Sequence, residues 1–220
     1  MRSGEDWSTC TREEAETAIG YRFRDEKILK RCFTHSSYSN LTGEESNERL
    51  EFLGDSVLQL FVTHLLFERN PHKQEGDLTE QRQKYVSQEA LTSSEKKAGL
   101  MRFLRYSGGE DNVGGKTPSN LFEAVIAGIY LDGGYDSAKQ FMGKFLTETD
   151  TVNYKNKLQE LVQPIAHETP VYTGAEKEGK YTCTVTALGK SAEAVGENKK
   201  AAEKEAAKKL YQILSARERS

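Results

Sequence analysis

Between residue 12 and about residue 147, the apolar residues of this 220-residue chain recur at the spacing i, i+3, i+4. That spacing places them along one side of an α-helix, so the pattern predicts an almost wholly helical region. We find no alternating stretch of the kind that predicts a half-buried strand. The predicted helical segments are residues 13–19, 25–37, 47–69, 77–99, 119–134 and 136–149.

Helix-breaking residues predict where these segments end. An Asn-Pro pair at 70–71 follows the longest segment, and a Gly-Gly pair at 133–134 separates the last two. Proline and glycine both disfavour helix continuation. Asp77 is predicted to be an N-cap, with Glu80 three residues later completing a capping box.

The periodicity changes after residue 152. Residues 181–187 alternate apolar side chains with threonines, as a half-buried strand does, and shorter strands are predicted at 170–175 and 191–196. A helix that ends near Pro164 precedes them, and an Ala-rich helix at 199–214 follows. We therefore predict an all-α domain over 10–147, a linker over 148–152, and a small α+β domain (α-β-β-β-α) over 153–216.

Composition narrows the class of protein. The chain is 36% hydrophobic and 30% charged. Its longest apolar runs fall short of the roughly 18 residues that suggest a membrane span, and its first residues lack a signal-peptide pattern, so we expect a cytoplasmic protein without a membrane partner. Its three cysteines, Cys10, Cys32 and Cys183, are widely spaced without a CxxC pair. That spacing predicts reduced thiols and no zinc site.

The charge is unevenly divided along the chain. Residues 153–220 carry 12 Lys and Arg against 9 Asp and Glu, whereas the preceding residues carry 19 against 25. A mildly basic part joined to an acidic part is compatible with a polyanion-binding unit attached to a metal-dependent catalytic unit.

Carboxylates occupy unexpected places in two of the predicted helices. Glu48, Glu51 and Asp55 are spaced at i, i+3 and i+7, so they share a face of a helix that is otherwise largely apolar. Glu123 is the single charge in the apolar stretch 119–131. Because a buried carboxylate needs a partner, a divalent ion shared by Glu123 with Glu51 and Asp55 would explain both features.

The chemistry of these ligands indicates which ion would fit. Carboxylates without His or Cys favour a hard cation, Mg²⁺ or Mn²⁺, which can activate a water and stabilise the leaving oxygen of a phosphodiester. The alternative is that Glu48, Glu51 and Asp55 simply face solvent. Gly54 favours the first interpretation, because glycine inside a helix usually marks a close approach by another element.

The stretch NERLEFLGDSVL, residues 47–58, resembles the signature of the ribonuclease III endonuclease domain. The resemblance extends to residues 21–40, 75–83 and 121–134. It implies a helical domain that forms a homodimer through the signature helix and uses Mg²⁺ to cut both strands of double-stranded RNA. The implied products have 5′-phosphate and 3′-hydroxyl ends with short 3′ overhangs, and the implied roles are ribosomal-RNA precursor processing and RNA turnover.

The resemblance also assigns roles to individual residues. Glu51 and Glu123 match direct metal ligands, and Asp55 matches an acid of the same cluster. Glu48 matches the first glutamate of the signature, and Glu75 matches an acid at the edge of the catalytic valley, although an exposed loop acid is an equal alternative. Phe52 matches a phenylalanine that enters a socket on the partner subunit.

One position departs from the family pattern. Asn120 stands where many bacterial members carry Asp, three residues before the catalytic glutamate. Both positions should face the site, and an amide keeps a carbonyl oxygen for a metal or its water but removes one negative charge. We therefore expect either cleavage that demands more Mg²⁺ or a weakened or inactive protein that still binds RNA. The sequence leaves open whether Asn120 is natural or engineered.

Residues 153–216 resemble a double-stranded-RNA-binding domain. Lys199 and Lys200 match the lysines of its KKxAxxxAA pattern, and Lys204 follows about one turn later, where it can reach phosphate. Gln159 and Gln163 share a face of the first helix, from which family members contact 2′-hydroxyls. The alternative for the lysines is a solvated helix face. The loop at 176–180 lacks the family's Gly-Pro-x-His.

Three hypotheses follow from the sequence. The first is a homodimeric double-stranded-RNA endonuclease, and the second is a protein that binds duplex RNA without cutting it. The third is a helical protein whose acidic cluster holds a structural metal, and which would show no salt-dependent affinity for duplex RNA.

Overall fold

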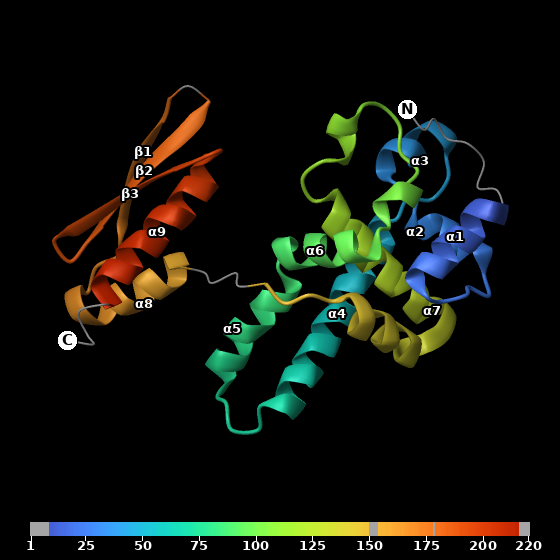
Figure 1. Cartoon of the computed structure of the whole chain (residues 1–220), viewed down its shortest axis with the longest axis horizontal. Helices are drawn as coiled ribbons and strands as arrows, with labels where there is room; N and C mark the ends of the chain where they lie inside the picture. Colours follow the sequence, from blue (N-terminus) through green and yellow to red (C-terminus); the bar gives the residue numbers. More distant parts are fainter. Residues whose placement is uncertain (1–8, 150–153, 178, 216–220) are drawn as a thin grey trace. The chain divides into compact units, whose positions relative to one another are not determined.

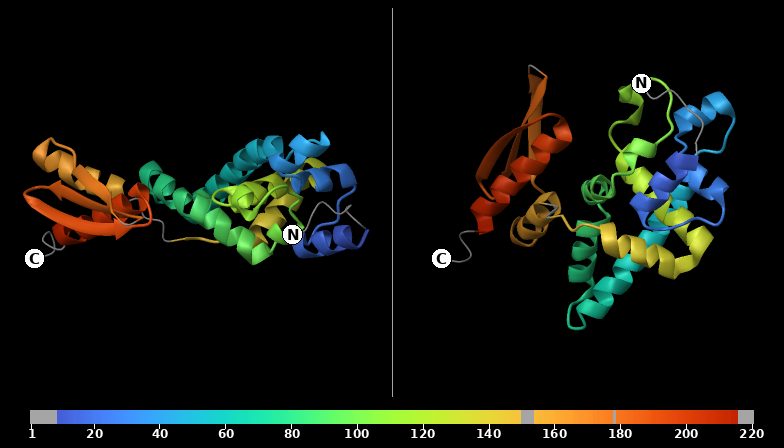
Figure 2. Two further views of the ribbon diagram at one scale, coloured as in Figure 1. Left: turned by 90° about the horizontal axis from the view of Figure 1, so that it is seen from above. Right: turned by 45° about the vertical axis from the view of Figure 1, so that its right-hand side comes forward.

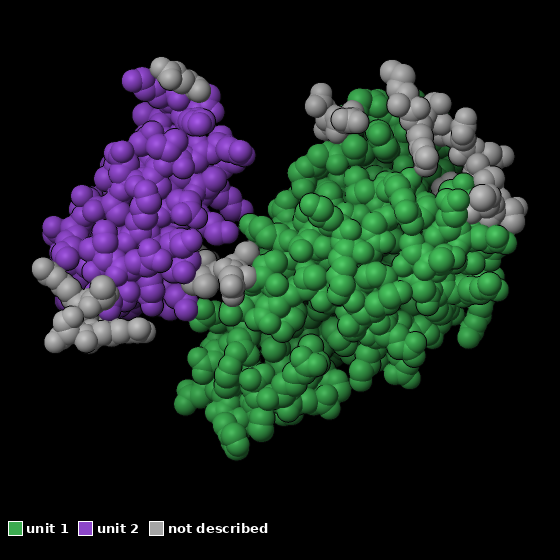
Figure 3. Space-filling model, viewed as in Figure 1, with its two compact units in different colours: residues 1–151 green, residues 152–220 purple. Residues whose placement is uncertain are grey.

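The structure of the chain is a computed structural model, which describes residues 9–149, 154–177 and 179–215 (Figure 1). The chain divides into two compact units, residues 1–151 and residues 152–220, which are coloured separately in Figure 3. Each unit has its own cluster of buried apolar side chains.

The described regular elements of unit 1 are all helices, joined by irregular segments, apart from an isolated parallel bridge between Thr34 and Arg105. Its elements, labelled in part in Figure 1, are α1 (Thr9–Ile19), α2 (Glu26–Cys32), α3 (Ser36–Thr42), α4 (Glu48–Arg69), α5 (Glu75–Val86), α6 (Gln88–Ala98), η1 (Met101–Phe103), η2 (Glu110–Val113) and α7 (Thr117–Phe145).

Helices α4 and α7 form the centre of unit 1 and pack against each other (Figure 2). The segment of α7 from Leu121 to Ile129 is buried at every position except Glu123, as the apolar sequence predicts. α4 is the one described helix whose length and composition would suit a membrane span. Its seven buried residues face the protein core, and buried core helices meet the same criterion.

Gly54 allows α4 and α7 to approach closely at the position of Glu123. A Cβ atom built on Gly54 would lie 1.9 Å from the backbone oxygen of Glu123 and 2.5 Å from its carbonyl carbon. No real side chain tolerates such distances, so only glycine fits this crossing. The close approach brings the carboxylates of α4 next to the carboxylate of α7.

We expect Gly54→Ala to destabilise unit 1. The added methyl group must push the two helices apart, and overpacking of this kind costs about 1–3 kcal/mol. Alanine's better helix propensity returns only about 0.5–1 kcal/mol. Gly143→Ala in α7 is the matched control, because its Cβ would meet nothing within 4 Å, and it should be stabilising. Urea unfolding of both variants checks the prediction, which fails if Gly54→Ala is as stable as Gly143→Ala.

Two predicted helices are each split in the structure. The segment 25–37 is divided between α2 and α3, because residues 33–35 leave the helix and His35 caps α3. The segment 77–99 is divided at Ser87, whose extended backbone (φ −66°, ψ 152°) places its hydroxyl to accept from the Ala90 N–H. A serine N-cap therefore interrupts a pattern that was periodic on both sides.

Other predicted helix boundaries have mixed outcomes. α4 ends at Arg69, directly before the Asn-Pro pair, and α7 is kinked at Gly134 (φ 80°), as predicted. The capping prediction for Asp77 is wrong. α5 already begins at Glu75, after the extended residue Gln74, and Asp77 lies within its first turn. There its negative charge still complements the helix dipole.

Unit 2 has the predicted order, with α8 (Tyr154–Ala166), β1 (Val171–Lys177), β2 (Lys180–Ala187), β3 (Lys190–Gly196) and α9 (Lys199–Ser215). The strands form an antiparallel sheet in the order β1-β2-β3, in which Val185 of β2 lies opposite Tyr172 and Ala192. Alternate residues of β2 pack with buried residues of α8 and α9. α8 does not stop at Pro164 but continues to Ala166.

The first residues of the predicted linker contact unit 1. The Thr149 N–H donates to the Lys84 carbonyl (2.9 Å), and the Tyr85 hydroxyl donates to the Glu148 carboxylate (2.9 Å). Residues 150–152 of the predicted linker lie outside the described residues, as do the end positions 153 and 216 of the predicted second domain.

The two cysteines with described side chains are free and buried. Cys32 lies in unit 1 and Cys183 in unit 2. The Cys32 thiol donates to the Ala124 carbonyl at 3.4 Å, and a Cβ on Gly128 would lie 2.2 Å from its sulfur. Burial raises the pKa of Cys32 to about 12.

Candidate active site

A pocket of unit 1 is lined by side chains from α4 and α7. Its lining residues are Glu48, Glu51, Phe52, Asp55, Asn120 and Glu123. The five polar residues among them are those that the sequence singled out as catalytic or metal-binding. The pocket holds about 540 Å³, enough for a phosphate group and several waters, each of which occupies about 30 Å³.

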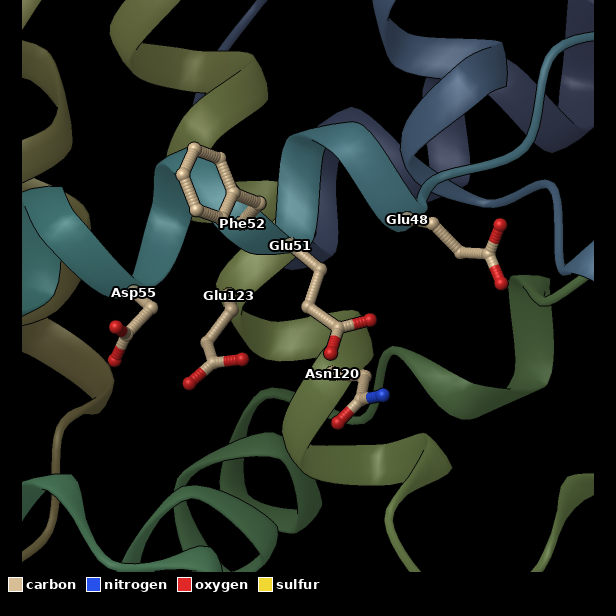
Figure 4. Close-up of a pocket in the computed structure, with 6 residues that line it drawn as sticks. All are labelled: Glu48, Glu51, Phe52, Asp55, Asn120 and Glu123. Atoms are coloured by element: carbon tan, nitrogen blue, oxygen red, sulfur yellow. The ribbon is translucent and has the colours of Figure 1, made fainter.

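Figure 4 shows how these side chains are directed. Glu51, Asp55, Asn120 and Glu123 point into the same space beside α4, whereas the carboxylate of Glu48 points away from them. The Ser46 hydroxyl donates to Glu48 at 3.1 Å. The structure therefore brings four of the five predicted polar residues together and places Glu48 at the margin.

Glu123 is strongly perturbed by its surroundings. Burial, followed by the nearby carboxylates of Asp55 and Glu51, raises its pKa from 4.5 to about 8. The positive charge of Lys116 opposes this shift. Perturbed carboxylates of this kind gather at functional sites, because a fold without a functional reason avoids burying like charges together.

Glu51 responds to the same environment. Burial and then the charge of Glu48 raise its pKa, while a hydrogen bond with Asn120 and the charge of Lys116 lower it. Asn120 is thus in contact with a predicted metal ligand. Sequence reasoning did not assign Lys116 to this face, yet its charge acts on both Glu51 and Glu123. Its position one turn before Asn120 was the signal that could have placed it there.

The carboxylates of the described residues share the pocket but do not form a complete set of metal ligands. Among the residues that the structure describes, no three His, Cys, Asp or Glu side chains form a ready-made metal-binding group. Mg²⁺ usually takes only one or two direct carboxylates and keeps several waters, so the donor set still fits this ion.

We expect the pH dependence of stability to report on Glu123. Its pKa is raised from 4.5 to about 8 in the folded protein, so the stabilisation it gives is complete below pH 4.5 and is lost as pH rises through 8. The neutral variant Glu123→Gln should therefore become progressively more stable, relative to the unchanged protein, between pH 4.5 and 8. Urea unfolding in metal-free buffers measures this difference, and a difference that stays constant with pH would contradict the prediction.

Glu75 lies outside this pocket. It is the first residue of α5, is exposed, and accepts from the Thr79 hydroxyl at 2.8 Å. Its proposed contact with RNA at the edge of the site stays a prediction.

The predicted RNA-contacting residues of unit 2 lie at its surface. Lys199 and Lys200 are exposed at the start of α9, where the Asn198 side chain caps the helix by accepting from the Ala201 N–H (3.0 Å). Lys204 is half-buried one turn later. Gln159 and Gln163 are exposed on α8, while Leu158 and Val162 of the same helix are buried.

Comparison with known proteins agrees with this division into two units. Residues 25–149 match the family model described as ribonuclease-III-like, and residues 154–214 match that of the double-stranded RNA binding motif. The chain belongs to the ribonuclease III family. The fold prediction is thereby confirmed, and the ribonuclease III assignment makes the chain an endoribonuclease.

Individual ribonuclease III proteins are similar over nearly the whole chain. Ribonuclease 3 of Oleidesulfovibrio alaskensis is 37% identical in an alignment of 222 positions, which covers 92% of this chain and 97% of that protein. Ribonuclease 3 of Clostridium beijerinckii is 36% identical over 94% of this chain and 97% of its own length. The nuclease domain of Campylobacter jejuni ribonuclease III has a TM-score of 0.55 and 34% identity, covering 60% of this chain and 94% of that domain. Its structure is described as flexible in a region involved in dimer formation.

Proposed function

We propose that this chain is a homodimeric, Mg²⁺-dependent endonuclease that cuts both strands of double-stranded RNA in the cytoplasm. Its products would carry 5′-phosphate and 3′-hydroxyl ends with short 3′ overhangs, and its roles would include ribosomal-RNA precursor processing and RNA turnover. The observation that carries the proposal is the convergence of Glu123 with Glu51 and Asp55 in one pocket of a ribonuclease III chain.

The donor set of the pocket supports the choice of metal. Glu51 and Glu123 would hold Mg²⁺ directly, with Asp55 and Asn120 orienting its waters. A bound Mg²⁺ supplies charge stabilisation and an activated water for phosphodiester hydrolysis. Mn²⁺ has the same preference for oxygen ligands. The proton that burial keeps on Glu123 must leave before this carboxylate can act as a ligand.

The exposed face of α4 supports the homodimer. Phe52, Leu60 and Phe67 are 80%, 59% and 70% exposed, and the spacing i, i+8, i+15 places them along one side of the helix. Aromatic side chains that are this exposed usually mark an interface. Sequence reasoning identified Phe52 but not Leu60 or Phe67, because periodicity alone cannot separate exposed from buried positions in a helix that is apolar on most sides.

Unit 2 supports duplex RNA as the substrate. The exposed Lys199 and Lys200 stand at a helix N-terminus, where the helix dipole adds to their attraction for phosphate. The glutamines of α8 can donate to and accept from 2′-hydroxyl groups, which distinguish RNA from DNA.

Incubation with a long RNA duplex tests the proposal. With Mg²⁺ we expect short fragments, and with EDTA we expect intact duplex, which is bound less tightly as salt increases. Salt-sensitive binding without cleavage would favour the RNA-binding protein that the Asn120 position suggests. The absence of both cleavage and salt-dependent affinity for the duplex would favour the structural-metal hypothesis.

We expect Asn120→Asp to lower the Mg²⁺ concentration needed for half-maximal cleavage, by roughly 10-fold, the lower end of what groups next to metal ligands contribute. The added negative charge would strengthen the attraction for the cation. Cleavage rates across a Mg²⁺ titration measure the effect. Asn40→Asp, which makes the same chemical change at an exposed residue of α3, serves as the control. An unchanged rate and an unchanged Mg²⁺ requirement would overturn this interpretation of Asn120.

A further inference from the structure

Arg105 is a buried arginine that does not line the active-site pocket. It is only 7% exposed and lies in the segment after η1. Its two terminal nitrogens donate to the two carboxylate oxygens of Glu44, at 2.7 and 2.8 Å, and one of them also donates to the Thr34 hydroxyl at 3.0 Å. The guanidinium lies 4.2 Å from the ring centre of Tyr38.

Contacts of Arg105 lead directly to the start of α4. Its backbone pairs with residues on both sides of Thr34: its N–H donates to the Phe33 carbonyl (2.8 Å), and its carbonyl accepts from His35 (3.0 Å). The Thr34 carbonyl in turn accepts from the N–H of Asn47 (2.8 Å), the residue that precedes α4.

The residue before α4 is itself fixed. Asn47 is 5% exposed, and its side-chain amide donates to the Cys32 carbonyl at 3.2 Å. Its own carbonyl accepts from the Glu51 N–H at 2.9 Å. The first turn of α4 carries Glu48 and Glu51. It is therefore joined through the buried residue Asn47 to Thr34, which is hydrogen-bonded to the Arg105 side chain.

Glu44 fixes the same segment from its other end. Besides its two hydrogen bonds from Arg105, the Glu44 carboxylate forms an ion pair with Lys30 at 3.5 Å. The next residue, Glu45, forms an ion pair with Arg31 at 2.8 Å. Arg105 lowers the pKa of Glu44 to about 2, so the pair remains charged across the pH range in which RNA is stable. The approach to α4 is thus held by directional charged bonds rather than by apolar packing.

We propose that Arg105 is a positioning residue that sets the orientation of the first turn of α4, and with it the placement of Glu51 in the active site. The inference rests on the proposed nuclease function for its consequence. A bidentate arginine fixes direction as well as distance, which apolar contacts do not. Displacement of a reacting group by about 1 Å can cost on the order of 100-fold in rate.

A stabilising role alone gives a different expectation. A buried ion pair is weak evidence for stability, because apolar replacement of both partners is often neutral. If Arg105 only stabilised the fold, its removal would lower stability without changing metal affinity or the catalytic rate of the folded protein. Orientation of Glu51, by contrast, affects both.

The experiment compares Arg105→Met, Arg105→Lys and Glu44→Gln with the control Arg12→Met. Arg12 is also a paired arginine of unit 1, bonded to Glu16, Glu26 and the Phe23 carbonyl, but it has no bond to α4. Each full-length variant is measured for thermal unfolding, for Mn²⁺ binding to the free protein by electron paramagnetic resonance, and for kcat and KM on duplex RNA.

We expect Arg105→Met to weaken Mn²⁺ binding and to lower kcat, each by about 10-fold or more, with little change in KM, because groups that orient metal ligands contribute 10–100-fold. Arg105→Lys and Glu44→Gln should show smaller losses of the same kind, which keeps the test decisive if Arg105→Met does not fold. The double variant Arg105→Met/Glu44→Gln should lose no more than Arg105→Met alone.

If the Arg105 and Glu44 variants fold and keep the Mn²⁺ affinity and kcat of the wild-type protein, the proposal is overturned. The nuclease function would still be upheld by cleavage of RNA by the wild-type protein. Equal losses in Arg12→Met would also overturn the proposal. If the wild-type protein cuts no RNA in any metal, the proposed function fails, and the Mn²⁺ comparison still decides whether Arg105 positions Glu51.

Discussion

Replacement of Glu123 by Gln should reduce the cleavage rate at least about 100-fold while leaving the affinity for duplex RNA nearly unchanged. Groups that merely orient metal ligands contribute 10–100-fold, so loss of a direct ligand should cost at least the upper value. The amide keeps the size of the side chain and removes the charge. Because the residues predicted to contact RNA lie in unit 2, apart from Glu75, binding should persist. Single-turnover cleavage and gel-shift titration measure the two quantities.

A matched variant separates this effect from a general loss of acidic charge. Glu13→Gln makes the same chemical change on α1, where the side chain is exposed, and should cleave at the wild-type rate. If Glu123→Gln cuts RNA as fast as Glu13→Gln does, the pocket between α4 and α7 is not the active site.

The second large effect is expected from Phe52→Asp. An exposed aromatic side chain at the centre of an interface commonly contributes 2 kcal/mol or more, so its loss should weaken dimerisation by at least about 30-fold. The introduced carboxylate would add a desolvation cost. Sedimentation equilibrium of the purified protein measures the dissociation constant. Cleavage should fall as well, because a monomer offers a duplex only one catalytic centre and because Phe52 also lines the pocket.

Ile165→Asp provides the control for this substitution. Ile165 is 60% exposed on α8, so the change in surface polarity is the same, but the residue belongs to unit 2. We expect it to dimerise normally. A Phe52→Asp protein that remains as dimeric as this control would show that the exposed face of α4 is not the interface.

The acidic site could be predicted because two local signals agreed. Glu123 stood alone in an apolar helix, where an unpartnered carboxylate is costly, and Gly54 marked the crossing that brings another helix to it. Helix periodicity then placed Glu51 and Asp55 on the shared face. These inferences needed only the spacing within single helices.

Features that depend on distant residues could not be predicted in this way. Arg105 and Glu44 are 61 positions apart, and each lies in a segment without periodicity, so no pattern links them. The split at Ser87 was hidden because apolar spacing continued through it, while the decisive factor was one backbone angle and a capping hydroxyl. The exposure of Phe67 likewise depends on which faces of α4 other helices cover.

The burial of Cys32 and Cys183 makes the two units separately observable during unfolding. Each thiol lies in the apolar interior of its own unit, so an alkylating reagent can modify it only when that unit opens. Mass spectrometry of the labelled peptides would then give two independent opening rates from one sample. The native chain thus carries an intrinsic reporter for its catalytic half and another for its RNA-binding half.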